Sequence, residues 1–154
     1  MRVAASIEYA GQDFSGWQKQ PGVKTVQGEL EKAIFLITKQ KISTTAAGRT
    51  DAGVHALGQV IHFDTDLKRS MHSWVKGINA FLPNSIRIKW AKEVSDDFHA
   101  RFSAKQREYQ YLLLSKPINS AIIHNYCGWT FYELNIELIK QSLLKFKGKH
   151  DFNA

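Results

Sequence analysis

The chain has 154 residues, of which 44% are hydrophobic and 12% aromatic, enough for one sizeable core or for one domain and part of a second. Its 21 basic and 14 acidic residues give a net charge of +7, which fits a nucleic-acid partner and equally an ordinary basic soluble protein. The single cysteine, Cys127, excludes an internal disulfide and a cysteine zinc cluster; it fits a reducing, cytoplasmic setting and a small buried residue. No stretch approaches the length of a membrane span, and the first residues lack the pattern of a signal peptide.

The first part of the chain predicts a strand, a helix and two further strands. Apolar residues alternate with other types over residues 3–9, which indicates a strand with one buried face. Apolar residues then recur at helical spacing over residues 26–37, and Thr25 is suited to the N-cap. Short strands are expected over Thr44–Ala47 and Gln59–Asp64, on either side of a glycine-flanked loop.

A second helix and a fourth strand complete this part. The helical face is formed by Met71, Trp74, Val75, Ile78 and Leu82. Pro83 and Asn84 end that helix, and residues 86–90 alternate as a strand. The order strand, helix, strand, strand, helix, strand is that of ferredoxin-like α+β domains with a mainly antiparallel sheet. It also resembles the RRM topology, but the sequence has no aromatic RNP motif.

The remaining residues predict the opening of a second unit. Residues 108–115 are expected to form a fifth strand, and residues 135–146 a third helix. Ile136, Ile139 and Leu143 would share one face of that helix. We therefore expect a ferredoxin-like domain over residues 1–95 that carries the glycine-flanked loop. Residues 96–154 would begin a second, related α/β unit whose remainder lies outside this chain.

The stretch AAGRTDAGVHALGQV, residues 46–60, places Arg49, Thr50 and Asp51 between two glycines. Gly48 and Gly53 permit backbone conformations closed to other residues, so the loop can hold a polar triplet at a fixed point above a sheet. The alternative is that the segment is only a turn, in which Asp and Gly serve the turn geometry.

The Arg49 and Asp51 side chains suggest a specific chemistry. A nearby guanidinium favours the ionised carboxylate, and an ionised carboxylate can attack an anomeric carbon. Ordinary glycosidases need two carboxylates, and Asp51 has no second acid close in sequence, although other aspartates could approach it in space. A single placed carboxylate fits a reaction that breaks a glycosidic bond without a hydrolytic water.

The segment FHARFSAKQREYQYLLL, residues 98–114, interleaves basic and aromatic side chains. Its basic residues are Arg101, Lys105 and Arg107, and the aromatic residues among them are Phe102, Tyr109 and Tyr111. Basic groups can meet phosphates while aromatic rings stack on unpaired bases. We expect this role for Tyr109, beside the basic cluster, whereas the position of Tyr111 favours a core-facing strand residue.

Two further features are less specific. In DFSGWQKQ, Trp17, Gln18 and Lys19 could grip RNA, or Trp17 could be a buried anchor of its loop. His55 and His62 stand alone, because the chain has no HExxH or CxxC pattern, so no metal site is expected.

Together these motifs resemble the tRNA pseudouridine synthase A family. The matching stretches, in the family's order, are IEYAG and SGWQ, TVQGELEKA on the first helix, AGRTDAGVHALGQVIHF, and DFHARFSAKQREYQY. The resemblance covers essentially the whole chain, and family members continue well beyond it.

The resemblance implies two related α/β halves around a continuous antiparallel sheet, an RNA cleft between them, a homodimer and no cofactor. It implies isomerisation of uridine to pseudouridine at positions 38, 39 and 40 of the tRNA anticodon stem-loop. By residue match, Asp51 is the catalytic aspartate, and Arg49 pairs with it and helps to displace the target base. Tyr109 matches the tyrosine that stacks on the target uracil. The family's other basic active-site groups lie outside this chain, so the 154 residues alone are expected to be inactive.

Two other classes of function stay open, a non-catalytic RNA-binding module and the structural half of a split protein. Asp51 discriminates against the first class, because a phosphate-binding surface gains nothing from a carboxylate at its centre.

Overall fold

The computed structural model describes residues 1–151, which form two units. The first runs from Met1 to Arg107 and the second begins at Glu108, and each is described by itself. Within residues 1–151, no helix is both long and apolar enough to span a bilayer.

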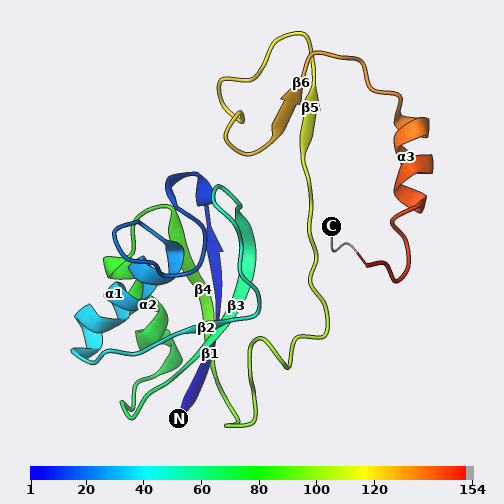
Figure 1. The fold of residues 1–154 in the computed structure, drawn as a ribbon. Coiled ribbons are helices and arrows are strands. Elements are labelled where there is room, and N and C mark those ends of the chain that lie inside the picture. Colours follow the sequence, from blue (N-terminus) through cyan, green and yellow to red (C-terminus); the bar gives the residue numbers. More distant parts are fainter. Residues whose placement is uncertain (152–154) are drawn as a thin grey trace. The chain divides into compact units, whose positions relative to one another are not determined.

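The first unit is a four-stranded antiparallel sheet with two helices on one side (Figure 1). The strand order is β2-β3-β1-β4, so the two outer strands are β2 and β4. The elements are β1 (Arg2–Tyr9), the 3-10 turn η1 (Gly11–Asp13), α1 (Val26–Thr38), β2 (Thr45–Ala46), β3 (Ala56–Asp64), α2 (Met71–Phe81) and β4 (Ile86–Val94). This arrangement confirms the predicted α+β class and is consistent with a ferredoxin-like unit.

The core lies between the sheet and the helices. Val3 and Phe63 are paired across β1 and β3 and are fully buried, as are Leu30 of α1 and Trp74 of α2. Burying side chains of this size contributes about 1.5–3 kcal/mol each, which makes this contact the main source of stability. As expected, the Thr25 hydroxyl caps α1, where it accepts a hydrogen bond from the backbone N–H of Gly28.

Part of the other face of the sheet, around His62, is covered by residues 96–107, which we call the crossing segment. Ala100 is buried, and its backbone N–H donates to Nδ1 of His62 on β3. Ala4 and Ser6 of β1 are buried as well, so this strand lacks the single buried face that its alternation predicts. Because the crossing segment packs on the sheet, the first unit extends to Arg107, later than the expected boundary at residue 95.

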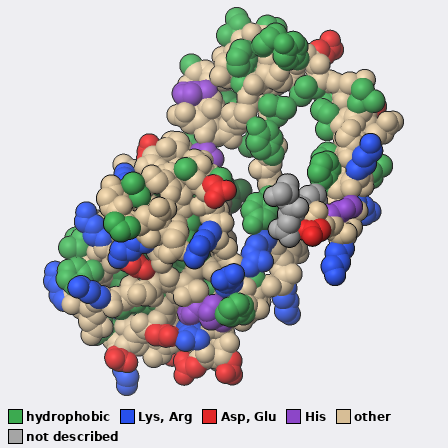
Figure 2. Space-filling view, viewed as in Figure 1, with side chains coloured by type: hydrophobic (Ala, Val, Ile, Leu, Met, Phe, Trp, Pro, Cys, Tyr) green, Lys and Arg blue, Asp and Glu red, His purple; other side chains and the backbone are tan. Residues whose placement is uncertain are grey.

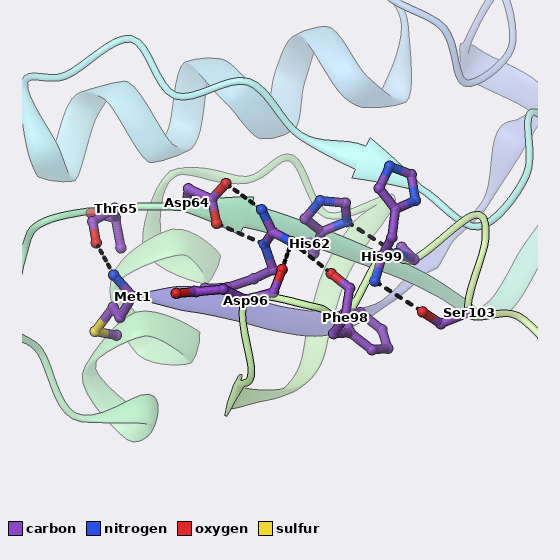
Figure 3. Close-up of polar contacts among 10 residues, drawn as sticks. Met1, His62, Asp64, Thr65, Asp96, Phe98, His99 and Ser103 are labelled. Atoms are coloured by element: carbon purple, nitrogen blue, oxygen red, sulfur yellow. Dashed lines mark hydrogen bonds and ion pairs between the residues drawn. The ribbon is translucent and has the colours of Figure 1, made fainter.

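Arg2 holds the crossing segment against the start of β1 and the end of β3. Its guanidinium forms a two-point ion pair with Asp64, with both N···O distances 2.8 Å. The same guanidinium donates to the backbone carbonyls of Asp96 and Phe98 (Figure 3).

This ion pair predicts a pH-dependent contribution to stability. The hydrogen bond from Arg2 lowers the pKa of the Asp64 carboxyl, so the stabilisation is present above the ordinary carboxyl pKa and is lost as the pH falls through the lowered one. Because Asp64 is largely exposed, we expect Asp64→Asn to lower the melting temperature by only a few degrees, on the order of 2–5 °C, at neutral pH. The difference in melting temperature between Asp64→Asn and the unmutated chain should shrink as the pH is lowered toward 3. Asp66→Asn, at another exposed carboxyl, should change the melting temperature little at neutral pH or at pH 3. Thermal melts at both pH values measure this, and an equal deficit for Asp64→Asn at both would contradict it.

The second unit contains few elements and much exposed apolar surface. Its elements are β5 (Leu113–Ser115), β6 (Gly128–Thr130) and α3 (Ile136–Leu144), and β5 pairs with β6 in parallel. Figure 2 shows hydrophobic side chains at the surface of this unit. Ile136 and Leu143 of α3 are both more than half exposed, so the apolar face predicted for this helix packs on no core among the described residues.

Three expectations for the second unit were wrong. The fifth strand covers only the last three of residues 108–115, because β6 is its one partner in the described chain and is itself three residues long. The sequence did not predict β6. Tyr111, expected in the core, is 83% exposed, and Cys127 is only half-buried, because residues 108–151 form no core that could receive them.

Candidate active-site loop

The loop between β2 and β3 contains a tight turn that presents Asp51. The backbone N–H of Val54 donates to the carbonyl of Asp51 at 3.2 Å, and Gly53 has φ = 79°. That conformation suits glycine at the third position of a type II turn. The turn interpretation of RTDAG is therefore correct for residues 51–54, and it is compatible with function because the Asp51 side chain is exposed.

Gly48 has a different role from the one expected. Its φ lies outside the left-handed region, so its conformation does not require glycine. A Cβ placed on Gly48 would lie 3.3 Å from Nε of Arg107, which shows that the missing side chain allows Arg107 to approach. Arg107 donates from Nη2 and Nε to the carbonyl of Ala47, at 2.6 and 3.2 Å. The crossing segment therefore reaches the base of the loop.

The segment after β1 holds the loop from the other side. The hydroxyls of Tyr9 and Thr50 are 2.8 Å apart, and the backbone N–H of Trp17 donates to the carbonyl of Thr50 at 2.9 Å. The backbone N–H of Gly11 donates to Nδ1 of His55 at 3.1 Å. These contacts fix the backbone on both sides of Asp51 while its carboxylate stays exposed.

Two glycines make this contact possible. A Cβ on Gly11 would lie 2.0 Å from the carbonyl oxygen of Val54, and one on Gly16 would lie 2.7 Å from that of Thr50. Neither distance is compatible with a side chain unless the backbone moves, so residues 11–16 and the loop pack main chain against main chain.

Arg49 and Asp51 are both exposed, and no ion pair joins them within the described chain. The arrangement presents a carboxylate and a guanidinium from one rigid loop toward solvent. Their pairing, expected from the sequence, stays a prediction.

The predicted RNA-binding residues that follow Phe98 lie in both units. Arg101 and Lys105 are exposed on the crossing segment with Arg107, and the Arg101 guanidinium lies 5.7 Å from the centre of the Phe102 ring. Tyr109 belongs to the second unit, where the residue is 75% exposed. Within the first unit, the structure therefore brings Arg107 together with the loop.

The Trp17 segment fits the anchor interpretation better than a grip on RNA. Trp17 is only 2% exposed, and its ring packs 6.0 Å from that of Tyr9. Gln18 is half-buried, and Lys19 forms a 2.9 Å ion pair with Glu31 of α1. The buried ring of Trp17 is not available for stacking on a base in this structure.

Sequence reasoning missed the supports of the loop, namely Tyr9, Gly11, Gly16 and His55. Gly11 and Gly16 gave a signal, since they flank the tryptophan loop, but only the fold shows what they approach. Tyr9 was assigned to the core by its alternation, and its hydroxyl contact with Thr50 joins residues far apart in the chain.

Comparison with known proteins gives a consistent result. A family model for tRNA pseudouridine synthase matches residues 5–103. The chain is 48% identical to the "tRNA pseudouridine synthase A" of Herminiimonas arsenicoxydans, over 99% of this chain and 57% of the relative. It is 49% identical to the protein of that name from Nitrosomonas eutropha, over 100% of this chain and 56% of the relative. The chain thus spans a little more than half the length of these relatives. Because the family model and these relatives agree, the chain belongs to the tRNA pseudouridine synthase family.

Proposed function

We propose that the full-length protein, meaning a chain of its relatives' length that contains this sequence, isomerises uridine to pseudouridine in tRNA. The substrate positions proposed are 38, 39 and 40 of the anticodon stem-loop. The observation that carries this proposal is the exposed Asp51 carboxylate on a loop whose backbone is fixed from two sides. Fixed placement of a reacting group is a large part of what an enzyme contributes to a rate.

The proposed reaction needs few protein groups. The N1–C1′ bond breaks, the uracil turns, a C5–C1′ bond forms, the proton of C5 is lost and N1 gains a proton. No water is consumed, so one carboxylate suffices where hydrolysis of a glycosidic bond needs two. A base inside a stem is out of reach, so the nucleotide must first leave the stack.

Asp51 works on the sugar or the base in this proposal. Arg49, two residues away on the same loop, enters the space that the flipped base leaves and faces the Asp51 charge. Tyr109 stacks on the target uracil. Its exposed ring is in keeping with this role, because a tyrosine inside a core would have no free face.

Contacts with the RNA backbone come from the crossing segment. Arg101, Lys105 and Arg107 are all exposed there and can neutralise phosphates, which makes binding strongly dependent on salt. The family's homodimer and cytoplasmic setting, and its lack of a cofactor, are part of the same proposal.

Tritium release tests the proposed reaction. Uridine labelled with tritium at C5 must lose the label when C5 joins C1′, so the full-length protein should release tritium from unmodified tRNA. Release from a tRNA whose positions 38, 39 and 40 hold no uridine should be at background. Binding without release would reduce the protein to an RNA-binding module.

The role of Tyr109 is tested by two substitutions in the full-length protein. Tyr109→Phe keeps an aromatic face and should retain affinity for a substrate stem-loop. Tyr109→Leu should weaken it by about 1–3 kcal/mol, the worth of stacking one base on an aromatic ring. Equal affinities of the two variants, measured by titration of a labelled stem-loop, would make Tyr109 a packing residue.

A further inference from the structure

Three successive backbone N–H groups of the crossing segment donate to histidine rings. The N–H of Ala100 donates to Nδ1 of His62 at 3.1 Å. The N–H groups of Arg101 and Phe102 both donate to Nδ1 of His99 at 3.3 Å. Figure 3 shows His62 on the sheet and His99 above it, and their ring centres are 4.8 Å apart.

The contact between His62 and Ala100 is shielded from water. His62 is 6% exposed and Ala100 is 2% exposed. A buried N–H without an acceptor is costly, because water cannot replace the lost partner. This hydrogen bond therefore fixes which residue of the crossing segment lies over β3.

The contacts continue from Ala100 to the base of the loop. The carbonyl of Arg101, the next residue, lies 3.4 Å from Nη2 of Arg107. The same Nη2 atom donates to the carbonyl of Ala47 at 2.6 Å, next to Gly48. A shift of the crossing segment at Ala100 would therefore change where Arg107 meets the loop that carries Asp51.

We propose that His62 is a positioning residue of this active site, whose unprotonated Nδ1 sets the register of the crossing segment and thereby the placement of Arg107 against the Asp51 loop. The link to catalysis rests on the proposed function. The link to the crossing segment does not.

The charge state of His62 decides whether this hydrogen bond can form. A protonated Nδ1 carries a hydrogen and is itself a donor, so it can no longer accept from the N–H of Ala100. The charged and titratable groups facing it are Arg2 of β1, Asp64 of β3 and His99 of the crossing segment. Burial lowers the pKa of His62, the positive charge of Arg2 lowers it further, and the carboxylate of Asp64 opposes these two effects. The ring therefore stays neutral to a lower pH than an ordinary histidine. Acid should loosen the crossing segment only at a pH below the one at which an ordinary histidine is protonated.

The test compares His62→Asn with His62→Leu, because Oδ1 of asparagine can occupy the place of Nδ1 and leucine offers no acceptor. Hydrogen exchange at the Ala100 amide is measured on the 154-residue chain. Uridine isomerisation is measured on the full-length protein. The leucine variant should lower Ala100 protection by about tenfold or more, and kcat should fall by roughly the same factor or more. The asparagine variant should restore both, and His72→Leu, at an exposed histidine of α2, should change neither.

The pH profile separates positioning from packing. In the unmutated chain, Ala100 protection should fall as the pH is lowered through the pKa of His62, and in His62→Asn this fall should be absent. Equal losses in the asparagine and leucine variants would overturn the proposal, as would a wild-type protection that does not change with pH. If His62→Leu does not fold, the proposal is still tested by comparing how Ala100 protection changes with pH in the wild type and in His62→Asn. A full-length protein that releases no tritium while Ala100 protection follows His62 would refute the proposed function and leave the role in the crossing segment standing.

Discussion

Asp51→Asn is expected to abolish pseudouridine formation by the full-length protein while leaving tRNA affinity within about tenfold, or about 1.4 kcal/mol. The amide keeps the size of the carboxylate but cannot act as an anionic nucleophile or base. The turn should survive, because it depends on the backbone carbonyl of Asp51 and on Gly53 rather than on the carboxylate. Tritium release and titration with labelled tRNA measure the two quantities separately.

The matched control is Asp66→Asn, at an exposed aspartate beyond the end of β3. It makes the same change of charge on the same unit and should leave the rate unchanged. Measurable tritium release by Asp51→Asn, at a rate above background, would remove Asp51 from its catalytic role.

Gly11→Ala is expected to cause a large loss of activity without contacting the substrate. The added Cβ would lie 2.0 Å from the carbonyl oxygen of Val54, so either residues 11–16 or the Asp51 loop must move. Overpacking of this kind costs about 1–3 kcal/mol of stability. A displacement of about 1 Å at a reacting group can cost on the order of a hundredfold in rate, so kcat should fall much more than the population of folded protein.

Gly77→Ala provides the comparison. Gly77 lies in α2, where a Cβ would meet Ile37 at an ordinary contact distance of 3.4 Å. Alanine is favoured over glycine inside a helix by about 1 kcal/mol, so this variant should be as stable as the original or more stable. Steady-state kinetics with thermal melts of both variants provide the measurement. A Gly11→Ala protein with unchanged kcat would show that the loop tolerates displacement from this side.

The fold of the first unit could be predicted because its local signals agree with its tertiary contacts. The apolar positions of α1 and α2 face one core, and Thr25 caps the helix that it was expected to cap. The burial of Ala4 and Ser6 could not be predicted, since it depends on the crossing segment, more than ninety residues later in the chain. In the second unit, the helix predicted over residues 135–146 forms as α3, but the strand predicted over residues 108–115 shrinks to β5, because a strand forms only where a partner strand exists.

In the candidate site, too, the features that depend on neighbouring residues could be predicted, and those that depend on residues far away in the chain could not. Asp51, Arg49 and the basic residues after Phe98 are candidates because of their types and spacing, and the structure places all of them at the surface of the first unit. The supports could not, because Gly11 and His62 matter through the backbone atoms that they meet, and those atoms belong to Val54 and Ala100. The sequence also predicted a special backbone conformation for Gly48. In the structure, a side chain at this position would instead crowd Arg107.

We propose that the Asp51 loop, within the full-length protein, isomerises uridine in the anticodon stem-loop of tRNA. The most direct measurement maps pseudouridine by position in one unmodified tRNA after incubation with the full-length protein and, in parallel, with its Asp51→Asn variant. We expect pseudouridine at positions 38, 39 and 40, wherever uridine stands there, with the unmutated protein, and none with the variant. Pseudouridine at other positions alone, or the same pattern with both proteins, would contradict this account of the site.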